Sequence, residues 1–276
     1  MSVPASRDAG ASKRRRLLIL GGTGEAAALA QFVCEKFGDR IRVTTSLAGR
    51  TERPAAVAGE LRVGGFGGAP ALAAYLREQE FDFVIDATHP FAARISAAAR
   101  LACAESGVPR LTLARPPWRA GPGDRWIEVA DAEAAAKLLP QLGRRAFLTL
   151  GRRDLAAFSR SQGCWYLVRL VEAPKEALPL GEPGRDYELV VARGPFTEEG
   201  ERELMRRHRI DVLVAKASGG EATRAKLIAA RELGLPAVLL RRPELEPGER
   251  AESLEDALGW LDRALAGLDG ASAVPM

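Results

Sequence analysis

Residues 17–37 read LLILGGTGEAAALAQFVCEKF, and this stretch decides the expected fold class. Its first four residues are all apolar, which is typical of a strand buried on both faces of its sheet. A glycine-rich turn follows, and an apolar stripe at helical spacing then runs from Ala26 to Phe37. A strand, a glycine turn and a helix in direct succession predict the first unit of a parallel α/β sheet.

The same alternation continues along the chain. Apolar runs predict further strands at 41–45, 60–63, 83–87, 110–113, 145–150, 164–171, 189–192, 211–216 and 237–240. Helical spacing predicts helices that include 70–79, 91–106 and 253–268. The layout of strand, glycine turn and helix recurs at 148–155 and 214–221. We therefore predict an α/β protein with two Rossmann-like, doubly wound parallel-sheet domains that face one cleft.

A segment rich in proline and glycine, ARPPWRAGPGD at 114–124, has no period and is expected to link the two domains. The first domain then spans 17–113, and the second spans 125–276. Residues 1–16 mix small and charged residues without periodicity, so we expect a flexible tail there.

Composition excludes several classes of protein. Of 276 residues, 47% are apolar and 28% charged, with a net charge of +4, as in a folded domain. Basic residues are spread along the chain, so no nucleic-acid partner is expected. The apolar run at 17–20 is too short for a membrane span. Cys34, Cys103 and Cys164 lie far apart and there are two histidines, so we expect no metal site, no disulfide framework and a cytoplasmic protein.

The glycine turn fits the pattern G-x-G-x-x-A, placed after a strand and at the start of a helix as dinucleotide binding requires. Glycines let the backbone approach a pyrophosphate, and the N–H groups of the first helical turn attract its charge. A plain turn is the alternative. The expected cofactor-binding residues here are Gly21, Gly22, Thr23, Gly24 and Glu25.

The second strand favours NADP over NAD. It runs into Thr45-Ser46-Leu47-Ala48-Gly49-Arg50, without the acidic residue that usually holds the ribose diol of NAD. Ser46 can donate to a 2′-phosphate and Arg50 can pair with it. The alternative for Arg50 is a solvated surface arginine.

The fourth strand leads into Ala87-Thr88-His89-Pro90, at the edge where a nicotinamide is expected to lie. Thr88 or His89 can cap the following helix, with Pro90 in its first turn. A role in starting the helix explains why threonine and proline stand at positions 88 and 90 better than it explains the histidine at position 89. All four residues are therefore expected at the cofactor, and His89 is also a candidate catalytic residue.

In the second domain, basic residues and glycines gather at the predicted strand ends. Lys216 ends a buried strand, and Ser218 with Glu221 matches a capping box. Cations beside helix N-termini suit an anionic substrate, whereas solvated arginines and an edge lysine are the alternatives. The expected substrate-binding residues are Gly151, Arg152, Arg193, Lys216, Ser218, Gly219 and Gly220.

Across about residues 16–242 the chain resembles the precorrin-6A reductase family of cobalamin biosynthesis, which includes the cobalt-precorrin-6A reductases. The resemblance is carried, in order, by LILGGTGEA, DATHPFAARIS, LTLGRRDLAAF, ARGPFTEEGERELM and VAKASGGEATRAKLIAARELGLPAVLLRRP. It implies an NADPH-dependent reductase of a tetrapyrrole, with hydride added at C19 and a proton at C18 to give precorrin-6B. The proton donor stays open among water, His89, Tyr187 and Lys216.

Other functions fit less well. A short-chain dehydrogenase needs Tyr-x-x-x-Lys, but residues four positions after the tyrosines are Gln79, Leu170 and Val191. No glycine loop continues into G-K-[ST], which excludes a P-loop. A noncatalytic NADP-binding redox sensor is the alternative function. The sequence leaves the oligomeric state, the presence of cobalt in the substrate and strand exchange between the domains undecided.

Overall fold

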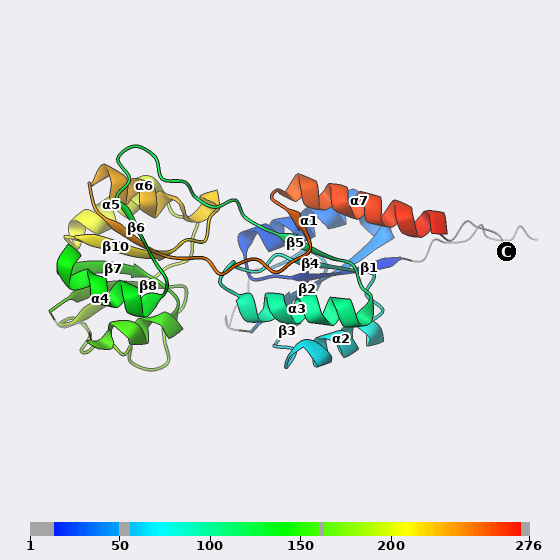
Figure 1. The fold of residues 1–276 in the computed structure, drawn as a ribbon, viewed down its shortest axis with the longest axis horizontal. Coiled ribbons are helices and arrows are strands. Elements are labelled where there is room, and N and C mark those ends of the chain that lie inside the picture. The colour runs from blue at the N-terminus through cyan, green and yellow to red at the C-terminus, as the bar shows by residue number, and fades with distance from the viewer. Residues whose placement is uncertain (1–13, 50–55, 161–162, 272–276) are drawn as a thin grey trace, which may run out of the picture. The chain divides into compact units, whose positions relative to one another are not determined.

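The computed structural model describes residues 14–49, 56–160 and 163–271 (Figure 1). The chain divides into two compact units. Unit 1 contains the described residues up to Ala114 together with those from Leu245 onward, and unit 2 is Arg115–Glu244. The chain therefore leaves unit 1, builds unit 2 and returns. This corrects the expectation that 125–276 is one domain, because the C-terminal helix packs in unit 1.

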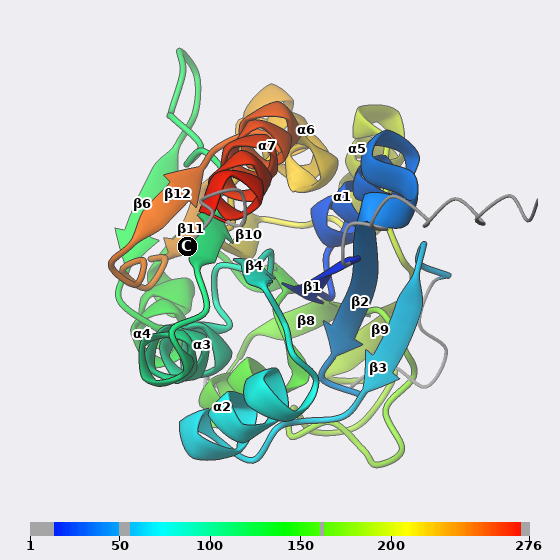
Figure 2. The same cartoon turned by 90° about the vertical axis from the view of Figure 1, so that its right-hand side faces the viewer.

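Unit 1 is built on six parallel strands in the order β12-β5-β4-β1-β2-β3. Figure 2 shows β1, β2 and β3 following one another to the edge of this sheet. The strands are β1 (Arg15–Leu20), β2 (Ile41–Leu47), β3 (Glu60–Val63), β4 (Phe83–Asp86), β5 (Arg110–Leu113) and β12 (Glu249–Ala251). Of the expected tail, the described residues are 14–16, and Arg15 and Arg16 already belong to β1.

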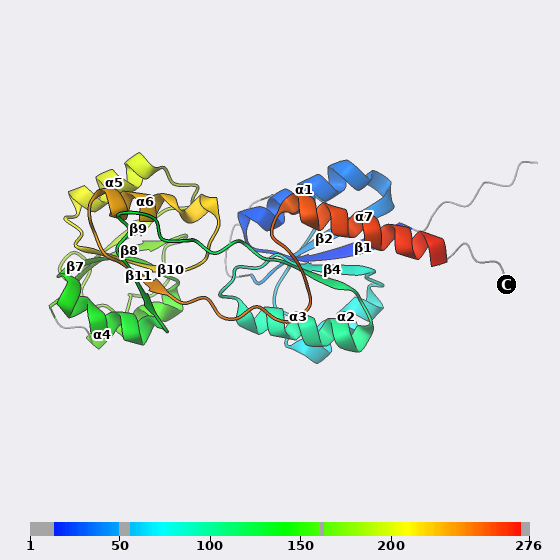
Figure 3. The ribbon, with the colours of Figure 1, turned by 45° about the horizontal axis from the view of Figure 1, so that its top comes forward.

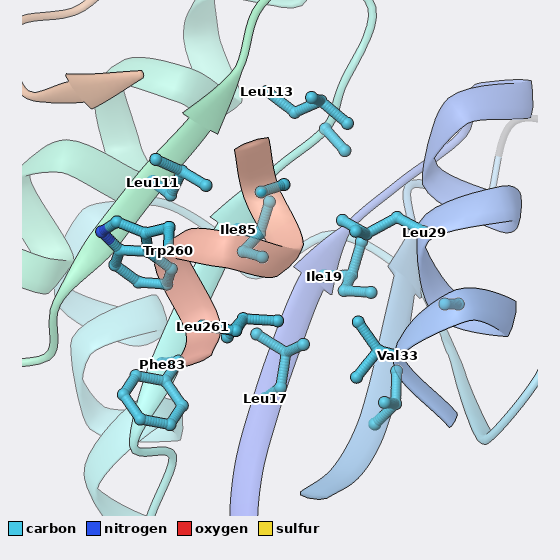
Figure 4. Close-up of a cluster of buried hydrophobic side chains, with 14 of the residues drawn as sticks. Leu17, Ile19, Leu29, Val33, Phe83, Ile85, Leu111, Leu113, Trp260 and Leu261 are labelled. Carbon is cyan, nitrogen blue, oxygen red and sulfur yellow. The ribbon is translucent and has the colours of Figure 1, made fainter. Parts of the chain in front are cut away.

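Helices cover both faces of this sheet (Figure 3), with α1 and α7 on one face and α2 and α3 on the other. They are α1 (Gly24–Phe37), α2 (Ala69–Glu78), α3 (Ala93–Ser106) and α7 (Leu254–Ala271), and a short 3-10 turn spans Gly38–Arg40. Figure 4 shows Trp260 and Leu261 of α7 in one core with Leu17, Phe83 and Leu29. The leucine stripe of α7, which is Leu254, Leu258, Leu261, Leu265 and Leu268, thus completes the first core.

Unit 2 repeats the plan with six parallel strands in the order β6-β11-β10-β7-β8-β9. The strands are β6 (Trp126–Val129), β7 (Arg145–Thr149), β8 (Trp165–Leu170), β9 (Tyr187–Val191), β10 (Val212–Lys216) and β11 (Ala237–Leu240). Its helices are α4 (Ala132–Leu142), α5 (Glu198–Arg207) and α6 (Ala225–Glu232), with 3-10 segments at Arg152–Arg160 and Glu221–Thr223. α5 and α6 cover one face and α4 the other (Figure 3).

Two of these strands were not expected from the sequence. β6 reads Trp-Ile-Glu-Val and is only partly buried, and β12 is a three-residue strand, Glu-Arg-Ala. Neither has the continuous apolar run that marks a strand covered on both faces. Among the described helices, none combines the length and the apolar character needed to cross a membrane.

Candidate functional site

The glycine turn of unit 1 leads directly into a capped helix. Thr23 is the N-cap of α1, and its Oγ1 accepts a hydrogen bond from the Ala26 amide at 3.1 Å. The same hydroxyl donates to the Ala87 carbonyl at 2.8 Å, which ties the turn to the end of β4. Thr23 therefore joins the two loops that were expected to hold the cofactor.

The three glycines of this turn differ in how much room there is for a side chain. A Cβ on Gly21 would lie 2.9 Å from Thr45 Cγ2, so a side chain there requires the strand to shift. Gly22 has φ of 106°, and added Cβ atoms on Gly22 and Gly24 meet nothing within 4 Å. The turn is open where a pyrophosphate would approach it, and the helix N-terminus supplies partial positive charge there. A dinucleotide therefore fits this part of unit 1.

Glu25 stands in the first turn of α1 and is half-buried. Its carboxylate would repel a pyrophosphate, so a contribution to binding has to come from its backbone N–H.

The end of β2 places Ser46 in a defined environment. Ser46 is 5% exposed, and its Oγ accepts from Nη1 of Arg62 at 3.2 Å. Arg62 lies on β3 and was not singled out from the sequence, because strand register is not visible there. The expected partner Arg50 lies outside the described residues.

The loop after β4 is organised by a buried carboxylate. Asp86 is 2% exposed, and its Oδ1 accepts from the backbone N–H of Thr88 at 3.1 Å and from the Thr88 hydroxyl at 2.7 Å. Nδ1 of His89 accepts from the Phe91 amide at 3.2 Å, which leaves Nε2 to carry the proton of the neutral ring. Asp86 was missed because it falls inside the strand predicted at 83–87.

The expected helix cap at Thr88 or His89 is wrong. Helix α3 begins at Ala93, and its N-cap Ala92 has no side-chain hydrogen bond. The Thr88 hydroxyl bonds back to Asp86 instead, and Pro90 lies in a turn before the helix. The Ala87–Pro90 segment is therefore a loop that precedes the helix, and Thr88 Oγ1 lies 3.3 Å from Ser96 Oγ of α3.

In unit 2, Lys216 meets a residue that sequence reasoning left out. Its Nζ lies 2.7 Å from Oδ2 of Asp154, and both side chains are mostly buried. A Cβ on Gly151 would lie 3.5 Å from that Oδ2 and 3.8 Å from the Lys216 Nζ. Gly151, Asp154 and Lys216 are thus brought together at the carboxyl ends of β7 and β10. The signal for Asp154 was its place next to two arginines after a strand end.

The two arginines predicted for this region are more exposed. Arg152 pairs with Glu176 at 3.2 Å, and Arg193 lies 3.9 Å from Glu172. Exposed pairs of this kind are worth about 0–1 kcal/mol, so they leave the guanidinium groups able to take another anion.

The Ser218–Gly220 loop is fixed by contacts with other residues of unit 2. Arg242 donates to the Ser218 carbonyl at 3.1 Å, and Trp118 Nε1 donates to the Gly220 carbonyl at 2.8 Å. Gly219 has φ of 68°, and a Cβ there would lie 2.3 Å from the Pro116 carbonyl oxygen. Packing therefore accounts for glycine at this position.

The expected capping box at Ser218 and Glu221 is also wrong. The 3-10 turn that starts at Glu221 has Gly220 as its N-cap, without a side-chain cap. Ser218 Oγ lies 3.4 Å from Thr223 Oγ1 instead. The backbone turn at Gly219 and Gly220 moves Ser218 out of the capping position.

The structure does not bring Tyr187 to Lys216, which corrects its placement among the catalytic candidates. Tyr187 is the first residue of β9 and is 4% exposed. Strand register places it level with Tyr166, Ala146 and Val212, at the amino end of the sheet. Lys216 ends β10 at the opposite edge.

A match to a protein family covers both units. The family model described as precorrin-6x reductase CbiJ/CobK matches residues 16–262. The chain belongs to this family. Membership in the precorrin-6x reductase family confirms the resemblance seen in the five sequence segments and makes the protein a member of a reductase family.

Individual relatives agree with the family match. Precorrin-6A reductase of Rhodococcus erythropolis is 47% identical over 247 residues, covering 89% of this chain and 97% of the relative. The Rhodobacter capsulatus enzyme of the same name is 46% identical over 246 residues, covering 89% and 95%. Cobalt-precorrin-6A reductase of Priestia megaterium is 28% identical over 250 residues, covering 88% and 96%.

A solved structure of CobK precorrin-6A reductase has a TM-score of 0.85 with this chain at 45% identity. The alignment covers 91% of this chain and 97% of that one. Together with the two six-stranded parallel sheets, this confirms the expected α/β class with two Rossmann-like units.

Proposed function

We propose that the protein is an NADPH-dependent precorrin-6A reductase, which forms precorrin-6B during synthesis of the corrin ring of cobalamin. The observation that carries the proposal is family membership over residues 16–262. When bound, NADPH supplies the hydride for C19 of the macrocycle, and a proton is added at C18. The reaction takes place in the cytoplasm, in keeping with three free cysteines among the described residues.

Unit 1 holds the nucleotide in this proposal. The open turn at Gly21–Glu25 takes the pyrophosphate through backbone N–H groups, and the 2′-phosphate lies near Ser46 and Arg50. The nicotinamide lies along the Ala87–Pro90 loop. The link from Thr23 to the Ala87 carbonyl supports this arrangement, because it fixes the pyrophosphate loop relative to the nicotinamide loop.

Unit 2 binds the carboxylates of the tetrapyrrole. The Lys216 ammonium group lies at the carboxyl end of β10, 2.7 Å from Asp154 Oδ2, and is the proposed partner of a substrate carboxylate. Arg152 and Arg193 add exposed guanidinium groups. The backbone of Gly151 and of Ser218–Gly220 completes the proposed substrate contacts.

The proton for C18 comes from water, His89 or Lys216. His89 carries a proton on Nε2 when neutral, and Lys216 carries one as an ammonium group. Tyr187 is no longer a candidate, because it lies at the other edge of its sheet.

The metal-free substrate is favoured over the cobalt-containing one. Relatives named precorrin-6A reductase reach 47% and 46% identity, whereas the relative named cobalt-precorrin-6A reductase has 28%.

The deciding experiment is anaerobic incubation of the purified protein with precorrin-6A and NADPH deuterated at C4. Precorrin-6B with deuterium at C19 is expected, and the visible spectrum shifts because a conjugated double bond is lost. A second incubation in D₂O with unlabelled NADPH is expected to place solvent deuterium at C18. Nucleotide binding without turnover of either the metal-free or the cobalt substrate would instead identify a redox sensor.

A further inference from the structure

Arg62 and Ser46 face each other across neighbouring strands at their carboxyl ends. In the parallel pair of β2 and β3, Ser46 lies in register with Arg62. Side chains in register point to the same face of a sheet, and the Arg62 Nη1 donates to Ser46 Oγ at 3.2 Å. The serine oxygen acts as acceptor in this contact, so its own O–H remains available to donate.

The guanidinium of Arg62 is fixed in place by neutral groups. Nη1 donates to the Gly64 carbonyl at 2.6 Å, and Nη2 donates to the Gly65 carbonyl at 3.1 Å. Its central carbon lies 3.8 Å from the centroid of the Phe66 ring and 5.1 Å from that of Tyr75. These contacts use three of the five N–H donors and leave Nε and one hydrogen of Nη2.

No carboxylate in the described part of the chain neutralises this charge. Arg42 on β2 is a useful contrast, because it donates from Nε to Glu60 at 2.7 Å. Arg62 is instead a rigid, half-buried cation whose side-chain entropy is already restricted before any ligand arrives. Because the side chain is already ordered, an anion that binds it pays a smaller entropic cost than it would with a freely rotating arginine.

The carboxyl end of the second strand is where a Rossmann unit holds the 2′ position of the adenosine ribose. A planar guanidinium beside a hydroxyl donor matches the oxygens of a phosphate. We propose that Arg62 pairs with the 2′-phosphate of NADPH, with the Ser46 hydroxyl as second donor, and sets the preference for NADPH over NADH. This inference rests on the proposed function, in which unit 1 binds NADPH.

The test compares ligands that differ only in the 2′-phosphate. Affinities for NADPH and NADH, and for adenosine 2′,5′-bisphosphate and adenosine 5′-monophosphate, are measured by calorimetry for the parent and for Arg62→Met. Loss of a charge-assisted contact is expected to weaken binding of the two 2′-phosphorylated ligands about tenfold to a hundredfold. Affinities for NADH and the monophosphate are expected to stay within about twofold of the parent.

Arg42→Met is the matched control, since it removes an arginine near the other end of β2 and is expected to leave all four affinities unchanged. Arg62→Lys keeps the charge without the planar fork, so its preference for NADPH is expected to fall by a smaller factor. If circular dichroism shows that Arg62→Met is unfolded, the ratio of NADPH to NADH affinity in Arg62→Lys serves as the test.

Equal weakening of all four ligands in the Arg62 variants would show that Arg62 only shapes the loop, and would overturn the inference. An unchanged ratio of NADPH to NADH affinity would also overturn it, while the reductase function would stand if precorrin-6A is still reduced. If the parent bound neither nucleotide, both this inference and the proposed function would fail.

Discussion

Gly22 and Gly24 differ in what the fold requires of them. Gly22 has φ of 106°, where a side chain is strained, whereas Gly24 is the first residue of α1 and has open space around an added Cβ. The fold therefore tolerates a side chain at position 24. A bound pyrophosphate does not, because the side chain would occupy the space through which the phosphate reaches the helix N-terminus.

Gly24→Val is expected to abolish NADPH binding at concentrations that saturate the parent, while the melting temperature stays within about 4 °C. Fluorescence titration and thermal circular dichroism measure the two quantities. Gly267→Val is the control, since Gly267 lies in α7 and also has open space around its Cβ. Normal NADPH binding by the position-24 variant would mean that the turn is not a nucleotide site.

Lys216→Met keeps most of the aliphatic stem and removes the charge that pairs with Asp154. If Lys216 holds a substrate carboxylate, KM for precorrin-6A is expected to rise about tenfold to a hundredfold, with unchanged NADPH affinity. A fall in kcat at unchanged KM would assign Lys216 to proton donation instead. Lys137→Met on α4 is the control, and unchanged kinetics in the Lys216 variant would contradict both roles.

Site residues that belong to a local sequence pattern could be predicted. Site residues that reach the site through strand pairing or through a contact with a distant residue could not. The glycine turn with Thr23 follows from a strand and a helix that are adjacent in sequence. Arg62 reaches Ser46 through strand register, and Asp154 reaches Lys216 from a different strand end. In the sequence Arg62 is an ordinary charged residue. Asp154 is marked only by its place beside two arginines after a strand end, which does not identify Lys216 as its partner.

Helix α6 buries a charged residue on the face that packs in unit 2. Lys226 is 9% exposed, and its Nζ lies 5.7 Å from the centroid of the Trp118 ring. Burial, together with the nearby charge of Arg169, lowers the pKa of Lys226 from 10.5 to about 8, and Glu201 offsets part of this effect. Arg169 itself is held by Glu201 at 2.6 Å, so its charge is already paired.

Lys226→Met is expected to stabilise unit 2 at pH 7. The folded state resists protonation of Lys226 until pH falls through about 8, whereas the unfolded chain is protonated below about 10.4. The contribution of Lys226 to the stability of the parent is therefore least unfavourable above pH 10.4 and worsens by about 3 kcal/mol as pH falls to 8. The variant lacks this loss, so its advantage at pH 7 is expected to vanish near pH 10.5.

Urea denaturation at pH 7, 9 and 10.5, followed by tryptophan fluorescence, measures this difference. Unit 2 holds three of the four tryptophans, so the signal reports mainly on it. A difference between variant and parent that stays constant over this pH range would contradict the assigned cause.

At the scale of elements, burial decides what can be predicted. β4 is buried along its whole length and β1 from Leu17 to Leu20, and both appear as apolar runs in the sequence. β6 and β12 lie at sheet edges, where partial exposure allows charged residues such as Glu128 and Arg250. The other two edge strands, β3 and β9, were predicted from the sequence, so position at an edge alone does not hide a strand; β6 and β12 also lack an apolar run.

At the scale of the whole molecule, unit 1 is assembled from two distant parts of the chain. β12 pairs with β5, and α7 contributes Trp260, Leu261 and Leu265 to the core that contains Leu17. The leucine stripe of α7 predicted a packed helix, but amphipathicity does not say which core the helix covers. The boundary of the second domain was therefore misplaced at its C-terminal end.

A fragment of residues 14–244 is expected to contain a folded unit 2 and an unfolded unit 1. Removing 245–276 strips three large buried side chains from the unit 1 core, each worth about 1.5–3 kcal/mol, which is comparable to the total stability of a domain. Residues 115–244 alone are expected to unfold cooperatively on heating. Protection from amide hydrogen exchange in β1 and β4 of the 14–244 fragment would contradict this prediction.

The return of the chain to unit 1 sets an unusual order for folding during translation. Domains generally fold as the ribosome releases them, with the N-terminal one first. Here unit 2 is the first whose parts are all present, while β5 must wait for β12 until the 130 residues from Arg115 to Glu244 have been made. At about 5–20 residues per second that wait lasts roughly 7–26 seconds. During this wait the edge of β5 that later pairs with β12 is unpaired. An unpaired strand edge can pair with a neighbouring nascent chain, so this is the period in which the protein is most exposed to aggregation.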